Sequence, residues 1–210
     1  GGSVTEATNN WWGDSSGPYN AGTSTPTGTG ARISVNVNYI PWIGRDPALS
    51  NPVIIIPGII SSYLHKNDGS NEEVWMNLPK MILSPDDSYL DELKLSIDGL
   101  EPQTTITAPD VIRKAGKSDF FNNLVAEFET NGYKENEDLF LFSYDWRLNI
   151  KNIAENLKTK IDSVKIATGS PNVDIVGHSM GGLVFKEYLN LYGDNEIGTF
   201  IDVATPHLGS

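Results

Sequence analysis

Ten residues near the carboxyl end of the chain place the strongest constraint on its fold. Residues 173–182 read Val-Asp-Ile-Val-Gly-His-Ser-Met-Gly-Gly, an apolar strand pattern that ends in Gly-x-Ser-x-Gly. A helical pattern follows without a proline, with apolar residues at Leu183, Val184, Tyr188, Leu189 and Tyr192. A sharp turn from a strand into a helix leaves no room for side chains two positions before and after its serine, so it requires Gly177 and Gly181. The pattern therefore predicts a strand, a tight turn at Ser179 and a helix.

Ser179 is the predicted nucleophile of this unit. The turn lifts its hydroxyl clear of the sheet, and the amide of Met180 lacks an intrahelical partner because it belongs to the first helical turn. That amide can therefore stabilise an oxyanion formed when the serine attacks a carbonyl, which is the chemistry of acyl transfer. The alternative interpretation is a glycine-rich turn whose serine only caps the helix.

Composition divides the chain near Asp46-Pro47, into residues 1–47 and 48–210. The first region is rich in Asn, Gly, Ser, Thr and Trp and ends in one alternating strand over residues 33–39. One strand and a polar loop cannot form a core alone, so this region must stack on something else. From Pro52 onward apolar strands alternate with amphipathic helices, which predicts an α/β domain with a parallel sheet covered by helices on both faces.

The second region holds four predicted strands and one segment that does not follow the alternation of strands and helices. Residues 53–56 form an uninterrupted β-branched run, and further strands are expected over 139–142, 173–178 and 199–203. Apolar stripes predict helices over residues 74–82, 120–128 and 150–164. Residues 84–116 are rich in Asp, Pro and Thr, so we interpret them as an insertion over the mouth of the site, either a lid or a plain surface excursion.

Charge and composition narrow the possible partners. The net charge of −12 disfavours nucleic acid and anionic membranes, because no basic stripe offsets it. The chain has no cysteine, which excludes disulfides and thiolate metal sites. No metal motif, phosphate-cradling loop or dinucleotide fingerprint occurs, so we expect no metal and no cofactor. The sequence gives no prediction of oligomeric state.

Residues 9–42 resemble the last coil of right-handed parallel β-helix proteins. The resemblance rests on Asn-Asn-Trp-Trp-Gly at 9–13, the Gly-Pro turn at 17–18, the alternating strand, and an exit through Tyr39, Pro41 and Trp42. It implies that Trp11 and Trp12 pack on a neighbouring coil; stacking on a polysaccharide is the less favoured alternative. It also suggests an extracellular or cell-surface location, although no signal peptide lies within this chain.

Residues 52–210 resemble the lecithin:cholesterol acyltransferase-like branch of the α/β-hydrolase lipases. The resemblance rests on the elbow and four further segments, at residues 57–64, 74–78, 142–147 and 205–210. It implies an incomplete α/β-hydrolase domain that acts on a lipid or other ester, with possible peripheral contact to a lipid surface. Hydrolysis and transfer to an alcohol stay open. A second oxyanion donor would come from the amide of Ile59 or Ile60, with Gly58 allowing the close approach. Trp75 and Tyr63 would lie at the substrate pocket, although a tryptophan on a helix face is more often core.

Asp145 and Arg147 are interpreted as supporting residues. Hydrolases of this fold present the serine first, then the acid and then the histidine, whereas these two residues precede Ser179. We therefore expect a buried carboxylate–guanidinium pair that holds the loop beneath the pocket.

The histidines are poorly placed for catalysis. His65 precedes Ser179, His178 lies inside the elbow, and His207 follows at the end of the next strand. Because a serine needs a neighbouring base, we expect the acid and the base to lie beyond Ser210 and the chain alone to be inactive. The alternative is a non-catalytic cell-surface protein, binding or structural, built on a β-helix stalk.

Overall fold

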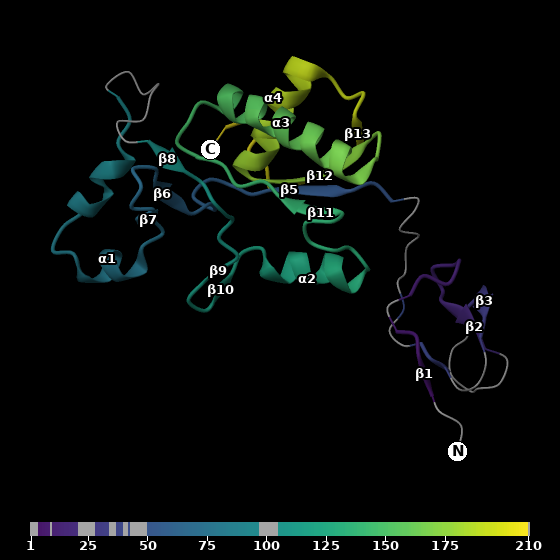
Figure 1. Ribbon diagram of the computed structural model, residues 1–210. Coiled ribbons are helices and arrows are strands. Elements are labelled where there is room, and N and C mark those ends of the chain that lie inside the picture. The colour runs from purple at the N-terminus through teal and green to yellow at the C-terminus, as the bar shows by residue number, and fades with distance from the viewer. Residues whose placement is uncertain are drawn as a thin grey trace. The chain divides into compact units, whose positions relative to one another are not determined.

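The computed structural model of the chain describes residues 4–8, 10–20, 28–33, 37–39, 42, 50–96 and 105–209. The chain forms two compact units (Figure 1). The first comprises Gly1–Ser50 with Asn123–Asp138, and the second comprises Asn51–Asn122 with Leu139–Ser210. Pro41, the expected boundary at Asp46-Pro47, and residues 97–104 of the expected insertion lie outside the described residues.

The first unit holds very short parallel strand pairs. β1 (Thr5–Glu6) pairs with β4 (Val37–Asn38), and β2 (Pro18–Tyr19) pairs with β3 (Gly30–Arg32). A methyl carbon on Gly17, whose φ is +87°, would lie 2.6 Å from the Trp42 ring, so this turn needs glycine to pack on the indole. Trp11 and Trp12 are half-buried. The resemblance of this unit to a β-helix coil stays a prediction.

A four-stranded parallel sheet is the centre of the second unit. Its order is β11 (Leu139–Leu141), β5 (Val53–Ile56), β12 (Val173–His178) and β13 (Ile197–Val203), so the predicted strands are confirmed with small differences at their ends. All four residues of β5 are buried, as its unbroken β-branched run requires. The carboxyl ends of parallel strands meet at one edge of the sheet, so the segments that follow β5 and β12 lie together.

Helices α3 (Ile150–Thr168) and α4 (Met180–Tyr192) pack against each other on one face of this sheet (Figure 1). The predicted apolar stripe of α3 is buried almost as expected, at Ile153, Ala154, Leu157, Ile161 and Val164. Asn149 caps the start of α3, and Gly169 ends it in a left-handed conformation with φ of 70°. The main core therefore lies between β5, β12 and these two helices.

The segment between β5 and β11 differs from the sequence prediction. β6 (Leu64–Lys66), β7 (Glu73–Trp75) and β8 (Ile106–Thr107) form a small antiparallel sheet, so Val74 and Trp75 lie in a strand and not in the expected helix. Helix α1 (Leu78–Leu83) begins later, because Asn77 caps it and Pro79 occupies its first turn. Helix α1 has no buried residue.

The remaining elements follow α1. They are a 3₁₀ helix, η1 (Ser88–Leu93), a hairpin of β9 (Lys114–Ala115) and β10 (Ser118–Asp119), and helix α2 (Asn122–Thr130). The predicted helix start at residue 120 was wrong: Ser118 and Asp119 pair with β9, and the amides of Phe120 and Phe121 donate to the carbonyl of Arg113. Because of this hairpin, helix α2 begins at Asn122 and not at residue 120.

Candidate functional site

Ser179 stands at the turn between β12 and α4 in a strained backbone conformation. Its φ of 52° and ψ of −121° are unusual for a residue with a side chain; such a conformation costs about 1–3 kcal/mol and persists only where the surroundings hold it. Two bonds do so: its amide donates to the carbonyl of Val203 at 2.9 Å, and its carbonyl accepts from the amide of Gly182 at 3.1 Å. The side chain is half-buried and makes no capping bond to α4, so the capping interpretation does not hold.

Three glycines make the turn possible. A methyl carbon on Gly181 would collide with the carbonyl oxygen of Ile56 and lie 2.7 Å from that of Pro57. One on Gly177 would lie 3.0 Å from the Cα atom of Gly182. Gly182 itself was missed by the sequence analysis, although it completes the Gly-Gly pair. A methyl carbon there would overlap Thr205, so the first turn of α4 fits directly against the segment after β13.

The loop after β5 runs directly beside Ser179, the predicted nucleophile. A methyl carbon on Gly58 would lie 3.0 Å from the Cβ atom of Ser179 and 3.1 Å from Nδ1 of His178, so only glycine fits there without displacing the elbow. Ile59 and Ile60 follow with exposed side chains, and Ile60 has φ of 59°. The structure thus brings together the backbone of Gly58 and the elbow that carries Ser179 and Met180.

Side chains from two other segments hold this loop. The indole of Trp75 donates to the carbonyl of Ile60 at 2.9 Å, and the Tyr144 hydroxyl donates to the carbonyl of Pro57 at 2.6 Å. Burial raises the pKa of Tyr144, so this donor stays protonated. Trp146 lies edge-on to Trp75 and donates to the carbonyl of Ser62 at 3.4 Å. Trp75 is therefore attached to the loop by its polar edge, a role that the sequence analysis did not assign.

Two further residues complete the support of the loop. Ser62, which is fully buried, accepts from the amide of Tyr144 at 3.1 Å and was also missed by the sequence analysis. Its neighbour Tyr63 is half-buried, and its amide donates to the carbonyl of Asp110 at 3.0 Å. The Ser61-Ser62 pair carries no sequence signal for this contact, because the partner of Ser62 is 82 residues away along the chain.

Asp145 and Arg147 form a two-pronged ion pair. Nε and Nη2 of the guanidinium donate to the two carboxylate oxygens at 2.8 Å and 2.6 Å, and the side chains are 4% exposed for Arg147 and 9% for Asp145. Nη1 also donates to the carbonyl of Glu92 in η1 at 3.4 Å. The pair therefore joins the loop after β11 to η1, and the Arg147 donors are engaged in structural contacts.

Each histidine contacts other residues, and none of the three, all within the described residues, hydrogen-bonds to Ser179. His178 stacks edge-on to Phe121 with ring centroids 5.8 Å apart. His65 contacts Asn71 at 3.2 Å in the small antiparallel sheet. Nε2 of His207 bonds to Oδ2 of Asp202. The Thr205 hydroxyl, followed by the His207 imidazole, holds the pKa of Asp202 below its ordinary value.

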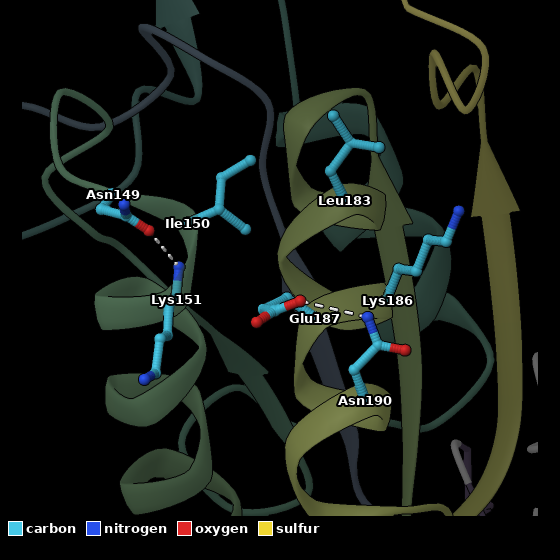
Figure 2. A pocket seen from close by; sticks show the side chains of 7 residues that line it. All are labelled: Asn149, Ile150, Lys151, Leu183, Lys186, Glu187 and Asn190. Carbon is cyan, nitrogen blue, oxygen red and sulfur yellow. Dashed lines mark hydrogen bonds between the residues drawn. The ribbon is translucent and has the colours of Figure 1, made fainter.

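A small apolar pocket and a wider groove lie on the described part of the second unit. A small apolar pocket beside the Gly58 loop is lined by Ile60, Ser61, Met76, Ile112 and Phe120. A wider groove of about 400 Å³ lies between α3 and α4 and is lined by Asn149, Ile150, Lys151, Leu183, Lys186, Glu187 and Asn190 (Figure 2). Figure 2 shows Asn149 bonded to Lys151 and Asn190 to Glu187. None of the predicted site residues lines this groove, whereas Ile60 lines the apolar pocket.

The described segments contain neither a metal-binding cluster nor a membrane-spanning helix. Among these residues, no group of three or more His, Asp or Glu side chains is arranged to hold a metal ion. No helix within them has the length and apolar character needed to cross a membrane.

Comparison with known proteins gives one family and several relatives. The family model described as "Lecithin:cholesterol acyltransferase" matches residues 72–210, more than half of the chain. "Lecithin-cholesterol acyltransferase-like 4" of Arabidopsis thaliana is 28% identical over 204 residues, covering 83% of this chain and 37% of that protein. "Phospholipase A(1) LCAT3" of the same plant is 26% identical over 188 residues, covering 76% and 42%. "Phosphatidylcholine-sterol acyltransferase" of Oryctolagus cuniculus is 23% identical over 214 residues, covering 84% and 48%. The chain thus spans less than half the length of these relatives.

Proposed function

This chain belongs to the lecithin:cholesterol acyltransferase family, and we propose that the protein containing it is a serine-dependent lipid ester hydrolase or O-acyltransferase. The observation that carries the proposal is the backbone of Ser179. A half-buried serine in a left-handed conformation, with no capping bond and with Gly58 against it, is a strained arrangement without a structural purpose. A nucleophilic role explains the strain, because the strained turn presents the Ser179 hydroxyl to a substrate.

The proposed reaction proceeds in two steps. Oγ of Ser179 forms a bond to the ester carbonyl carbon while a base takes its proton, and the amides of Met180 and of Ile59 or Ile60 stabilise the oxyanion. The intermediate collapses with cleavage of the bond to the alcohol, which leaves protonated, and an acyl-enzyme remains. Water or a second alcohol then accepts the acyl group, giving hydrolysis or transfer.

The acid and the base belong to a part of the protein beyond Ser210 in this proposal. It is supported by the placement of the three histidines within the described residues, because none of them hydrogen-bonds to Ser179 and His178 packs against Phe121. The 210-residue chain alone is therefore expected to be inactive towards esters, because its serine has no base.

A lipid surface is the proposed environment of the substrate. Helix α1 exposes apolar side chains, with Ile82 and Leu83 exposed by 77% and 80%. Such a surface fits peripheral contact with neutral or zwitterionic lipid, since the charge of −12 repels an anionic membrane. The apolar pocket beside Ile60 would take the start of an acyl chain. A lid role for residues 84–116 and an extracellular or cell-surface location are part of the same proposal.

A covalent probe tests the nucleophile. A fluorophosphonate should label the full-length protein at Ser179, and Ser179→Ala should lose both labelling and turnover of a phospholipid ester. Ser163→Ala removes an exposed serine of α3 and should leave both unchanged. Labelling that persists in Ser179→Ala would contradict the proposal, and absence of labelling in the wild type would favour a non-catalytic binding protein.

A further inference from the structure

The backbone position of Ser179 depends on the carbonyl of Val203, the last residue of β13. The Ser179 amide donates to the carbonyl of Val203, and the strand pair ends there, with His178 opposite Val203. The terminal carbonyl of an edge strand has no continuing ladder to fix it, because the pairing stops at that residue. Whatever holds the end of β13 therefore also holds the backbone of the nucleophile.

The segment after β13 folds back on the strand. Ala204 takes a left-handed conformation with φ of 52°, and the amide of His207 donates to the carbonyl of Thr205 at 2.9 Å. Nε2 of His207 then bonds to Oδ2 of Asp202, which is the residue before Val203. The His207 side chain thus closes a turn whose two ends lie on either side of the Val203 carbonyl.

The same turn also reaches the first turn of α4. Asp202 lies opposite Gly177 in the strand pair, and its Oδ1 would be 2.9 Å from a methyl carbon on Gly182. Thr205 lies even closer to Gly182. The lowered pKa of Asp202 keeps its carboxylate ionised at neutral pH, where it accepts a hydrogen bond from His207.

We propose that His207 is a positioning residue: through Asp202 it fixes the Val203 carbonyl, and through that carbonyl the backbone of Ser179. It does not touch the reacting atoms, so it is distinct from the base that the reaction requires. The inference rests on the proposed function, since it deepens the role of the same nucleophile. Removing the imidazole should let the end of β13 move and misplace the hydroxyl, which costs activity without weakening substrate binding.

Three variants of the full-length protein test this assignment. His207→Ala removes the bond to Asp202, whereas His207→Gln keeps an N–H donor at nearly the same place. His65→Ala is the matched control, because His65 also contacts a carboxylate, that of Glu73 at 3.9 Å, but lies in the small antiparallel sheet. His207 is 40% exposed, so its replacement should leave the melting temperature close to that of the wild type.

Hydrogen exchange and kinetics give two separate readouts. The Ser179 amide should exchange roughly fivefold faster in His207→Ala and at the wild-type rate in the other two variants. The kcat for ester turnover should fall about tenfold to a hundredfold in His207→Ala with KM within twofold, and His207→Gln should recover most of it. Unchanged exchange in His207→Ala would overturn the proposal. Loss of activity in His207→Gln equal to that of Ser179→Ala would also overturn it, because His207 would then be the base.

Exchange does not depend on turnover, so failure of the two proposals can be told apart. If the full-length protein turns over no ester, the proposed function fails, yet faster exchange in His207→Ala would still support the contact. If turnover depends on Ser179 but neither exchange nor kcat changes in His207→Ala, only the positioning role is lost.

Discussion

The parallel sheet and the segment between β5 and β11 are built on different principles, although both contribute to the site. In the sheet and its helices, apolar side chains are buried: Ile54, Leu157 and Ile175 have no exposed surface. In the segment, the exposed apolar side chains of α1 contribute little burial, and hydrogen bonds from Trp75 and Tyr144 hold the loop at residues 57–62. The segment also buries Leu64, Val111 and Ile112, so the difference lies in α1, which adds little to the core, and in the loop, whose position is set by hydrogen bonds from Trp75 and from Tyr144 after β11.

Truncation of a buried and of an exposed apolar residue should show the largest difference between the regions. Leu157→Ala leaves a cavity in the core and should lower the free energy of unfolding by about 2–5 kcal/mol. Ile82→Ala in α1 should change it by less than about 0.5 kcal/mol, because the side chain is 77% exposed. Urea unfolding followed by circular dichroism measures both. Equal losses would mean that α1 packs on the core and that the contrast is wrong.

Replacement of Trp75 should separate the position of the loop at residues 57–62 from the stability of the fold. Trp75→Phe keeps an aromatic ring but loses the bond to the carbonyl of Ile60, which should cost about 1 kcal/mol, or roughly fivefold in kcat of the full-length protein. Trp42→Phe is the control, because its indole donates to the carbonyl of Ser15 at 3.2 Å in the other unit. A similar loss of activity in both variants would indicate a general effect of losing an indole.

The smallest expected effect is the loss, at low pH, of the stability that Glu196 contributes to the fold. Glu196 contacts Lys165 at 2.5 Å and Lys158 at 3.3 Å, and its pKa is lowered mainly by the bond to Lys165. A carboxylate with a lowered pKa stabilises the fold above its ordinary pKa of about 4.3, and this contribution is lost as the pH falls through the lowered value.

Glu196→Gln should therefore be less stable than the wild type by up to about 1 kcal/mol at pH 7, since the ion pair is partly exposed. The difference should shrink below about pH 4, as the wild-type carboxylate becomes protonated. Thermal unfolding of both proteins between about pH 3 and pH 7 measures this difference. A constant difference across that range would show that Glu196 acts through packing and not through charge.

Local patterns predicted the elements whose residues contact near neighbours in sequence. The β-branched run of β5, the stripe of α3 and the glycines around Ser179 each reflect a constraint that a short window contains. The same approach failed at Val74 and Trp75, where helical spacing predicted a helix and pairing with β6 made a strand. Short apolar runs fit both structures, so their partner decides.

What the sequence alone determined is the order of elements in the sheet region and the strand, turn and helix around Ser179. These follow from steric limits on residues only a few positions apart. The tertiary structure alone decided that Gly58 lies against Ser179 and that the Trp75 indole reaches the Ile60 carbonyl. It also decided that His207 bonds to Asp202, next to the Val203 carbonyl that accepts from the Ser179 amide. Those contacts depend on how strands and turns distant in sequence are aligned in space, and no short stretch of residues encodes that alignment.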